Sequence, residues 1–199
     1  MVYPAKLTPE GIMNRALELL ETQGPDALNM RTLAEGLGVR ASSLYRHYPD
    51  RAALLSAVEE QTTLDLHAVM ARAGEQHTTP VPRLRATGIA YLAYAVAHPH
   101  LYALLLAPRP PTPATPGPGK DLWNLVLRLV GEVSGDPDDT ARTVALWSYL
   151  HGFALVTLSG LLGLSGDQGG FLVGLEALID GFGNAKTGAG TSVPASAST

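Results

Sequence analysis

The sequence predicts an all-α protein with about nine helices, and three features of the chain indicate this. Apolar residues recur at spacings of three and four, as in Ile12, Ala16, Leu19 and Leu20. Helix-capping and helix-ending residues separate these segments, and the chain has no convincing strand hairpin. With 199 residues, of which 46% are hydrophobic, the chain is large enough to bury a sizeable core.

The first helix begins after Thr8, whose hydroxyl can cap it ahead of Pro9 at the first helical position. Glu10 then lies near the positive end of the helix dipole. Gly24, which a proline follows, ends this helix.

Two short helices are predicted on either side of Gly38. Asn29 can cap the first, and the second runs over residues 41–47. After a proline, Asp50 can cap a fourth helix that runs to about Ala73. The apolar residues that indicate the helix capped by Asn29 and the helix capped by Asp50 are Leu33, Ala34, Leu37, Leu54, Leu55 and Val58.

The middle of the chain is predicted to contain a polar joint over residues 74–82 and a helix over residues 84–97. The residues expected to face inward from that helix are Ile89, Leu92 and Val96. A short apolar segment, residues 101–107, precedes a loop over residues 108–120, because six prolines preclude a regular helix there.

Three helices are predicted in the last third, over residues 122–133, from about Pro137 to about Leu164, and over residues 171–182. The most apolar segment, residues 144–164, contains a histidine and several Gly, Ser and Thr residues, which favours a buried helix over a membrane span. From residue 185 onward the composition predicts a disordered tail.

Charge is distributed unevenly along the chain. The net charge is −4, yet residues 1–53 hold six basic and six acidic residues, so the deficit lies in the remainder. Within residues 30–51, four arginines stand against only Glu35 and Asp50. A local basic patch on an acidic protein favours a small docking surface for an anion over general nucleic-acid coating. The absence of cysteine excludes disulfides and thiolate metal sites and fits a reducing cytoplasm.

The pair of short helices has the requirements of a helix-turn-helix. Gly38 tolerates the positive φ of a tight turn, and Ala34 is small enough for a close helix crossing. Burial of Leu44 leaves a polar face on the second helix, with side chains of the kinds that reach base edges and phosphates in a major groove. A solvated face is the alternative, and Tyr48 can equally be a packing residue.

Residues 8–58 resemble the DNA-binding domain of TetR/AcrR transcriptional regulators, most specifically in the segment "LYRHYPDR". A looser resemblance, in "WSYLHGF", links residues 147–153 to the regulatory domains with a Trp-His-Gly signature. The resemblance implies operator contacts from Arg31, Arg40, Ala41, Ser42, Ser43, Tyr45 and Arg46, and phosphate contacts from His47, Tyr48 and Arg51. Two residues depart from the family pattern, because Arg51 replaces a usual Lys and Gly36 replaces a better helix former.

The rest of the chain lacks the constellations of an enzyme, and no catalytic residue, metal ligand or cofactor is predicted. His98 and His100 flank a proline at a helix end, where a histidine complements the dipole. The resemblance implies a mainly apolar small-molecule pocket, although aromatic residues of this kind can also be core and His151 can be a satisfied core histidine. The candidate pocket residues are Tyr91, Tyr94, Tyr102, Trp123, Trp147 and His151.

The last two predicted helices carry more apolar surface than one small domain easily hides. Two such helices from each subunit would form a four-helix dimer interface, which also matches the family's usual arrangement. The candidate interface residues are Leu146, Leu150, Phe153, Leu158, Leu161, Leu172, Leu175 and Ile179.

Together these features predict a DNA-binding domain over residues 1–53, an effector-binding and dimerisation domain over residues 54–184, and a tail over residues 185–199. The expected function is that of a cytoplasmic, homodimeric repressor that binds a pseudo-palindromic operator and is released by a small molecule. The alternative is a helical ligand-binding or enzymatic protein whose helix-turn-helix does not function, and the sequence does not separate a repressor from an activator.

Overall fold

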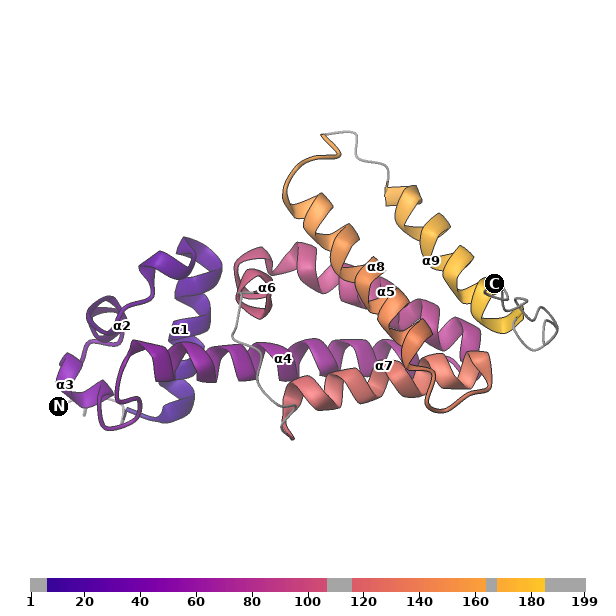
Figure 1. Ribbon diagram of the computed structural model, residues 1–199. Coiled ribbons are helices and arrows are strands. Elements are labelled where there is room, and N and C mark those ends of the chain that lie inside the picture. Colours follow the sequence, from indigo (N-terminus) through magenta and orange to yellow (C-terminus); the bar gives the residue numbers. More distant parts are fainter. Residues whose placement is uncertain (1–6, 107–115, 164–167, 185–199) are drawn as a thin grey trace, which may run out of the picture. The chain divides into compact units, whose positions relative to one another are not determined.

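The computed structural model describes residues 7–106, 116–163 and 168–184. Over these residues it contains nine α-helices, one 3₁₀ helix and no strand, which confirms the all-α prediction (Figure 1). The elements are α1 (Pro9–Gln23), η1 (Pro25–Ala27), α2 (Met30–Gly36), α3 (Ala41–Leu44), α4 (Arg51–Glu75), α5 (Pro80–Ala97), α6 (Pro99–Leu105), α7 (Pro118–Ser134), α8 (Thr140–Leu158) and α9 (Gln168–Asn184).

The chain divides into two compact units. The first comprises Met1–Val69 and Ala93–Leu122, and the second comprises Met70–Leu92 and Trp123–Thr199. The domain boundary expected after residue 53 therefore falls inside α4, which is one continuous helix. The predicted tail and residues 107–115 of the predicted loop lie outside the described residues.

A hydrophobic core holds the helices of the first unit together. It contains apolar residues of α1, α2, α3, α6 and the first turns of α4. Its fully buried members include Ile12, Leu19, Leu28, Leu33, Leu44 and Leu54. The short helices α2 and α3 are thus fixed by burial, since helices of this length are marginal by themselves.

The predicted caps of the first helices are confirmed. The Thr8 hydroxyl oxygen accepts a hydrogen bond from Gly11 N–H at 3.1 Å, and Pro9 is the first helical residue. The Asp50 carboxylate accepts a hydrogen bond from Ala53 N–H at 2.8 Å at the start of α4. The sequence alone was sufficient here because capping depends on neighbouring residues.

The buried face of α5 differs from the predicted one. Ile89 and Val96 are exposed, and the residues that face inward are Leu84, Thr87, Gly88, Tyr91, Tyr94 and Ala95. Apolar residues occur around most of this helix, so their spacing does not select one face. The helix also begins at Pro80 inside the predicted joint, because prolines in a first turn lack only N–H groups that have no helical partner.

The later helices also differ from prediction at their starts. Pro118 begins α7 inside the expected loop, whereas α8 begins only at Thr140, after Asp139, and ends at Leu158. The Asp139 carboxylate accepts a hydrogen bond from Arg142 N–H at 3.1 Å, so this residue and not Pro137 sets the start of α8. Among the described residues, no helix combines the length and hydropathy needed to cross a membrane.

Within the second unit, α8 and α9 are packed neighbours (Figure 1). The Tyr149 ring lies against Gly174, where an added Cβ would collide with the ring and its hydroxyl oxygen. That hydroxyl donates a hydrogen bond to the Phe171 carbonyl at 2.7 Å. A glycine in α9 therefore permits the close approach of these two helices.

Candidate functional site

The segment between α2 and α3 folds as the tight turn that the sequence predicts. Gly38 has a φ of +65°, in the left-handed region that favours glycine. Val39 N–H donates to the Ala34 carbonyl at 3.0 Å, and Gly38 N–H donates to the Glu35 carbonyl at 3.1 Å. Since Leu33 and Leu44 are completely buried on the inner side, α2 and α3 form a helix-turn-helix.

Asn29 fixes the first turn of α2. Its side-chain oxygen accepts hydrogen bonds from Arg31 N–H at 3.1 Å and from Thr32 N–H at 2.9 Å. These bonds satisfy two of the backbone donors that a helix start leaves without a helical partner. The cap holds Arg31 at the exposed start of the helix.

Polar side chains cover the outer face of α3 and the turn that follows. Ser42, Tyr45, Arg46 and His47 are exposed, whereas Ala41 and Ser43 are half-buried. The Tyr45 ring is 51% exposed, although an aromatic ring gains little from contact with water alone. This face therefore presents hydrogen-bond donors that the subunit core does not need.

The helix predicted over residues 41–47 is shorter than expected. It ends at Leu44, and residues 45–47 continue as hydrogen-bonded turns in which the Leu44 carbonyl accepts from His47 N–H at 2.8 Å and from Tyr48 N–H at 3.0 Å. Pro49 explains this, because a proline disfavours helical dihedrals at the residue before it.

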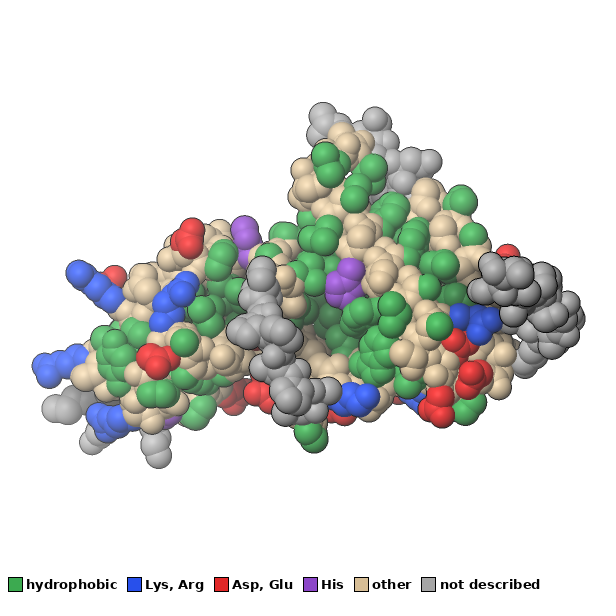
Figure 2. Space-filling model, viewed as in Figure 1, with side chains coloured by type: hydrophobic (Ala, Val, Ile, Leu, Met, Phe, Trp, Pro, Cys, Tyr) green, Lys and Arg blue, Asp and Glu red, His purple; other side chains and the backbone are tan. Residues whose placement is uncertain are grey.

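Arginine side chains gather over the N-terminal helices (Figure 2). Arg31, Arg40 and Arg46 are exposed. Arg31 Nε lies 2.9 Å from Glu35 Oε1, but the Arg31 side chain is 88% exposed. An exposed pair of this kind contributes little to stability, so Arg31 can exchange Glu35 for a phosphate at small cost.

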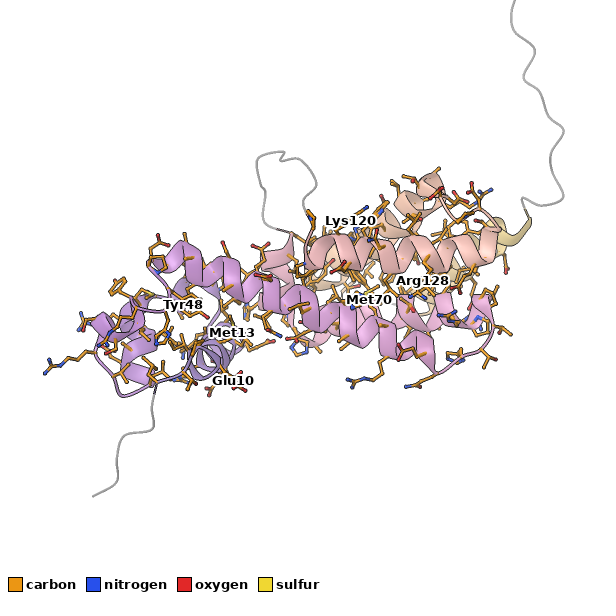
Figure 3. All side chains as sticks on the ribbon, turned by 90° about the horizontal axis from the view of Figure 1, so that it is seen from below. Glu10, Met13, Tyr48, Met70, Lys120 and Arg128 are labelled. Carbon is orange, nitrogen blue, oxygen red and sulfur yellow. The ribbon has the colours of Figure 1, made fainter. Side chains whose placement is uncertain are left out.

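Tyr48 and Arg51 are placed differently from the other candidate DNA contacts. Tyr48 is half-buried and packs on the core, and its side chain projects into the helical bundle together with Met13, whereas Glu10 points away (Figure 3). Arg51 donates from Nε to the Leu28 carbonyl at 2.6 Å and from Nη2 to the Pro25 carbonyl at 2.8 Å. Their phosphate contacts stay predictions. The packing of Tyr48 is the alternative that the sequence offered, whereas the sequence did not indicate the carbonyl contacts of Arg51.

The unusual Gly36 in α2 has a packing partner. A Cβ added at Gly36 would lie 2.6 Å from Arg15 Nε, so the guanidinium of Arg15 crosses α2 at this point. Arg15 also forms an ion pair with Glu18, with 2.6 Å between Nη1 and Oε2. Because Gly36 has no side chain, there is room for Arg15 of α1 to lie against α2. The spacing of residues within α2 does not reveal this contact.

Three of the six candidate pocket residues meet in the second unit. The Tyr91 ring centroid lies 5.7 Å from that of Trp147 and 5.3 Å from that of His151, and the Trp147 and His151 centroids are 4.9 Å apart. Tyr91 is buried, while Trp147 and His151 are half-buried. These three residues form what we term the aromatic cluster.

The protonation of His151 follows from its surroundings. Its Nδ1 lies 2.9 Å from the Trp147 carbonyl oxygen, which only accepts hydrogen bonds, so Nδ1 carries a proton. Burial lowers the pKa of His151, and the bond to Trp147 opposes this in part. The imidazole is thus neutral at pH 7.

The other three candidate pocket residues have different surroundings. Tyr94 and Tyr102 belong to the first unit, where the Tyr94 hydroxyl donates to the Thr62 carbonyl at 3.4 Å and Tyr102 is buried. Trp123 is half-buried on α7. Burial raises the pKa of Tyr94 above its ordinary value, with smaller contributions from Asp65 and Glu21, so its hydroxyl stays protonated.

A hollow of about 370 Å³ lies beside α7 in the second unit, and no candidate pocket residue lines it. Glu132 on its wall pairs with Arg83 at 2.7 Å and with Arg128 at 3.9 Å, and Arg128 is marked on α7 in Figure 3. In the part of the chain that the structure describes, no three His, Asp or Glu side chains are grouped to hold a metal ion. His98 instead pairs with Glu21, with 2.5 Å between Nδ1 and Oε1.

The candidate dimer residues fall into two sets. Leu146, Leu150, Leu175 and Ile179 are buried inside the subunit, and Phe153 and Leu158 are half-buried. Leu161 and Leu172 are exposed. Three further exposed residues, Val144, Leu155 and Val173, lie on α8 and α9 and were not among the predicted ones. The buried residues of each helix recur every three or four positions, and these exposed residues lie outside that pattern. The pattern could therefore have identified them from the sequence.

Comparison with known families matches both parts of the chain. Residues 12–58 match the bacterial regulatory proteins of the tetR family, and residues 84–180 match the tetracyclin repressor-like C-terminal domain. An uncharacterized HTH-type transcriptional regulator of Mycobacterium tuberculosis is 31% identical over 166 residues, which are 80% of this chain and 74% of that protein.

A second relative and a solved structure extend these matches. The class A tetracycline repressor of Escherichia coli is 41% identical over 78 residues, which are 39% of this chain and 32% of the repressor. A Rhodococcus sp. RHA1 protein with unknown function has a similar structure, with a TM-score of 0.76, 26% identity, and coverage of 89% of this chain and 97% of that one.

Proposed function

This chain belongs to the TetR family of bacterial regulatory proteins, and we propose that it is a homodimeric repressor that a small molecule releases from a pseudo-palindromic operator. The exposed polar face of α3, held on a tight helix-turn-helix, is the observation that carries this proposal. A DNA-binding transcriptional regulator needs a surface of this kind, and it acts in the cytoplasm where the chromosome is accessible.

The reading surface is built from α3 and the starts of its neighbours. Arg40 and Arg46 supply cations for guanine or phosphate, and Ser42, Tyr45 and His47 supply further hydrogen-bond donors. Half-buried Ala41 and Ser43 lie at the inner edge of the face, where Ala41 can contact a thymine methyl group. Arg31 extends the same surface onto α2.

A dimer supplies the specificity that one short helix lacks. Two copies related by a two-fold axis read two half-sites spaced by about 34–36 Å, one turn of DNA. The exposed apolar residues of α8 and α9 support an interface there, because a monomer rarely leaves such side chains together in water.

The aromatic cluster supports a mainly apolar effector. Trp147 and His151 offer half-buried rings that a ligand can contact. Because His151 is neutral, it suits an uncharged or aromatic ligand better than a charged one. The effector lowers operator affinity only if it binds the form that does not bind DNA more tightly.

The test is selection of bound fragments from random double-stranded DNA at two salt concentrations. Wild type is expected to enrich an inverted repeat, whereas Tyr45→Ala is expected to enrich none while remaining folded and dimeric. Leu64→Ala is the matched control, since it truncates an exposed apolar side chain of α4 outside the reading surface.

Two results would count against the proposal. Enrichment of the same repeat by Tyr45→Ala would remove α3 as the reader. Failure of folded, dimeric wild-type protein to enrich any sequence would favour a ligand-binding or enzymatic protein on this scaffold.

A further inference from the structure

Arg51 joins the two ends of the helix-turn-helix. It is the first residue of α4, directly after the segment that carries α3, and its guanidinium reaches back to the chain that precedes α2. Nε donates to the Leu28 carbonyl at 2.6 Å, and Nη2 donates to the Pro25 carbonyl at 2.8 Å. The two acceptors are 23 and 26 residues away along the chain, so these bonds are tertiary contacts.

The two carbonyls belong to the first residue and the C-cap residue of η1, the short 3₁₀ turn between α1 and α2. The Pro25 carbonyl already accepts a hydrogen bond from Leu28 N–H at 3.3 Å, and Arg51 adds a second donor to it. Leu28 is completely buried and is followed at once by Asn29, the cap of α2. Arg51 therefore fixes the residue from which α2 begins.

The position of α3 depends on restraints of this kind. With four residues, α3 has too few internal hydrogen bonds to be stable by itself, and its N-cap residue Arg40 makes no side-chain capping bond. The turn at Gly38 sets one end of α3, and the start of α4 sets the other. A tie from α4 to the start of α2 therefore restricts how the reading helix is held.

We propose that Arg51 is a positioning residue, which orients α3 for operator binding by tying α4 to the Pro25 and Leu28 carbonyls. This rests on the proposed function as a DNA-binding repressor. It differs from the role that the family resemblance implies, in which this cation contacts a phosphate.

Only an arginine side chain presents two N–H donors in the arrangement that bonds both carbonyls at once. A guanidinium presents several N–H groups in a rigid plane and bonds both acceptors together. A lysine ammonium at the end of a flexible chain is a compact charge and does not reproduce this geometry. Arg51→Lys therefore separates the two roles, because it keeps the charge that a phosphate needs and loses the paired bonds.

The experiment measures affinity for the selected operator and for random DNA over a range of salt concentrations. Arg51→Lys is expected to lower the preference for operator over random DNA about tenfold, the loss of roughly one charge-assisted hydrogen bond. Its affinity for random DNA and the salt dependence of that affinity are expected to match wild type. Arg72→Lys makes the same change at an exposed residue near the other end of α4 and is expected to alter nothing.

Arg51→Gln completes the test by removing the charge. A phosphate contact predicts that its salt slope falls by about 0.9. Wild-type operator affinity in Arg51→Lys, with a reduced slope in Arg51→Gln, would overturn the positioning role and leave the proposed function intact. A wild type with no preference for any sequence would instead overturn the proposed function, and the positioning role with it.

Discussion

Arginine side chains in the N-terminal unit differ in role because they differ in surroundings. Arg31 is exposed beside Glu35, Arg51 is bound to backbone carbonyls, and Arg15 crosses α2 at Gly36. Arg51 is exposed as well, but its guanidinium would have to leave two backbone carbonyls to reach a phosphate. Residue type and position in the motif thus identify candidate DNA-binding arginines. The local contacts then distinguish an arginine that is available to DNA from one that holds the fold.

The contact between Arg15 and Gly36 predicts a coupled effect on stability. Alanine at position 36 has a better helix propensity by about 1 kcal/mol, but its Cβ would displace the Arg15 guanidinium. We expect Gly36→Ala to raise the free energy of unfolding by about 1 kcal/mol more in an Arg15→Ala background than in wild type. Urea denaturation of the four proteins measures this difference.

The same cycle contains its own control. Arg15→Ala alone reports the loss of the Glu18 ion pair and of packing on α2, and that loss cancels in the comparison. An equal effect of Gly36→Ala in both backgrounds would mean that the guanidinium moves aside at no cost.

At the scale of the element, the sequence predicted the three capped helix starts of the first unit, but not the starts of α5, α7 and α8 or the inward face of α5. Thr8, Asn29 and Asp50 act as caps as expected, since a cap depends on backbone groups two or three residues away. The inward face of α5 was predicted wrongly, because Ile89 and Val96 are as apolar as the buried tyrosines. Which side of an apolar helix is covered depends on neighbours that are remote in sequence.

The cap of α8 predicts a pH-dependent contribution to stability. Burial raises the pKa of Asp139, but hydrogen bonds from the Arg142 side chain and backbone and from Ser134 outweigh it, so the pKa is lowered. Asp139→Asn keeps the capping oxygen and loses the charge. We expect it to lower the free energy of unfolding by about 1 kcal/mol at pH 7, because the helix start and Arg142 both favour a carboxylate.

The sign of the pH effect follows from linkage. A lowered carboxyl pKa stabilises the fold above the unfolded value of about 3.9, and this stabilisation is lost as the pH falls through the folded value. The gap between wild type and Asp139→Asn should therefore close in acid, as thermal unfolding at several pH values will show. Asp138→Asn, at an exposed neighbour, is the control, and a gap independent of pH would contradict the assignment.

At the scale of the whole molecule, the sequence predicted the helix-turn-helix more fully than it predicted which apolar residues of α8 and α9 stay exposed. The helix-turn-helix is local, so Gly38, Leu33 and Leu44 lie within a few residues of one another in the chain. An interface between copies depends on which apolar residues the subunit leaves uncovered. Leu150 is 1% exposed and Val173 is 72% exposed, and composition does not distinguish them.

This difference decides where the dimer is tested. A charge at Leu150 would enter the subunit core, where it would unfold the protein whether or not it dimerises. Arginine at Val173 is compatible with a folded monomer, because the side chain points into solvent. In a two-fold interface on α9, however, each copy would bring one unpaired charge into an apolar contact.

We expect Val173→Arg to sediment as a monomer at concentrations where wild type is a dimer, with an unchanged helical circular dichroism spectrum. Operator affinity is expected to fall by at least about 100-fold, because one subunit reads only one half-site. Val81→Arg places the same charge at an exposed apolar residue in the first turn of α5 and is expected to leave the dimer intact. If Val173→Arg remains dimeric while Val81→Arg dissociates, the interface includes the start of α5 and not this face of α9.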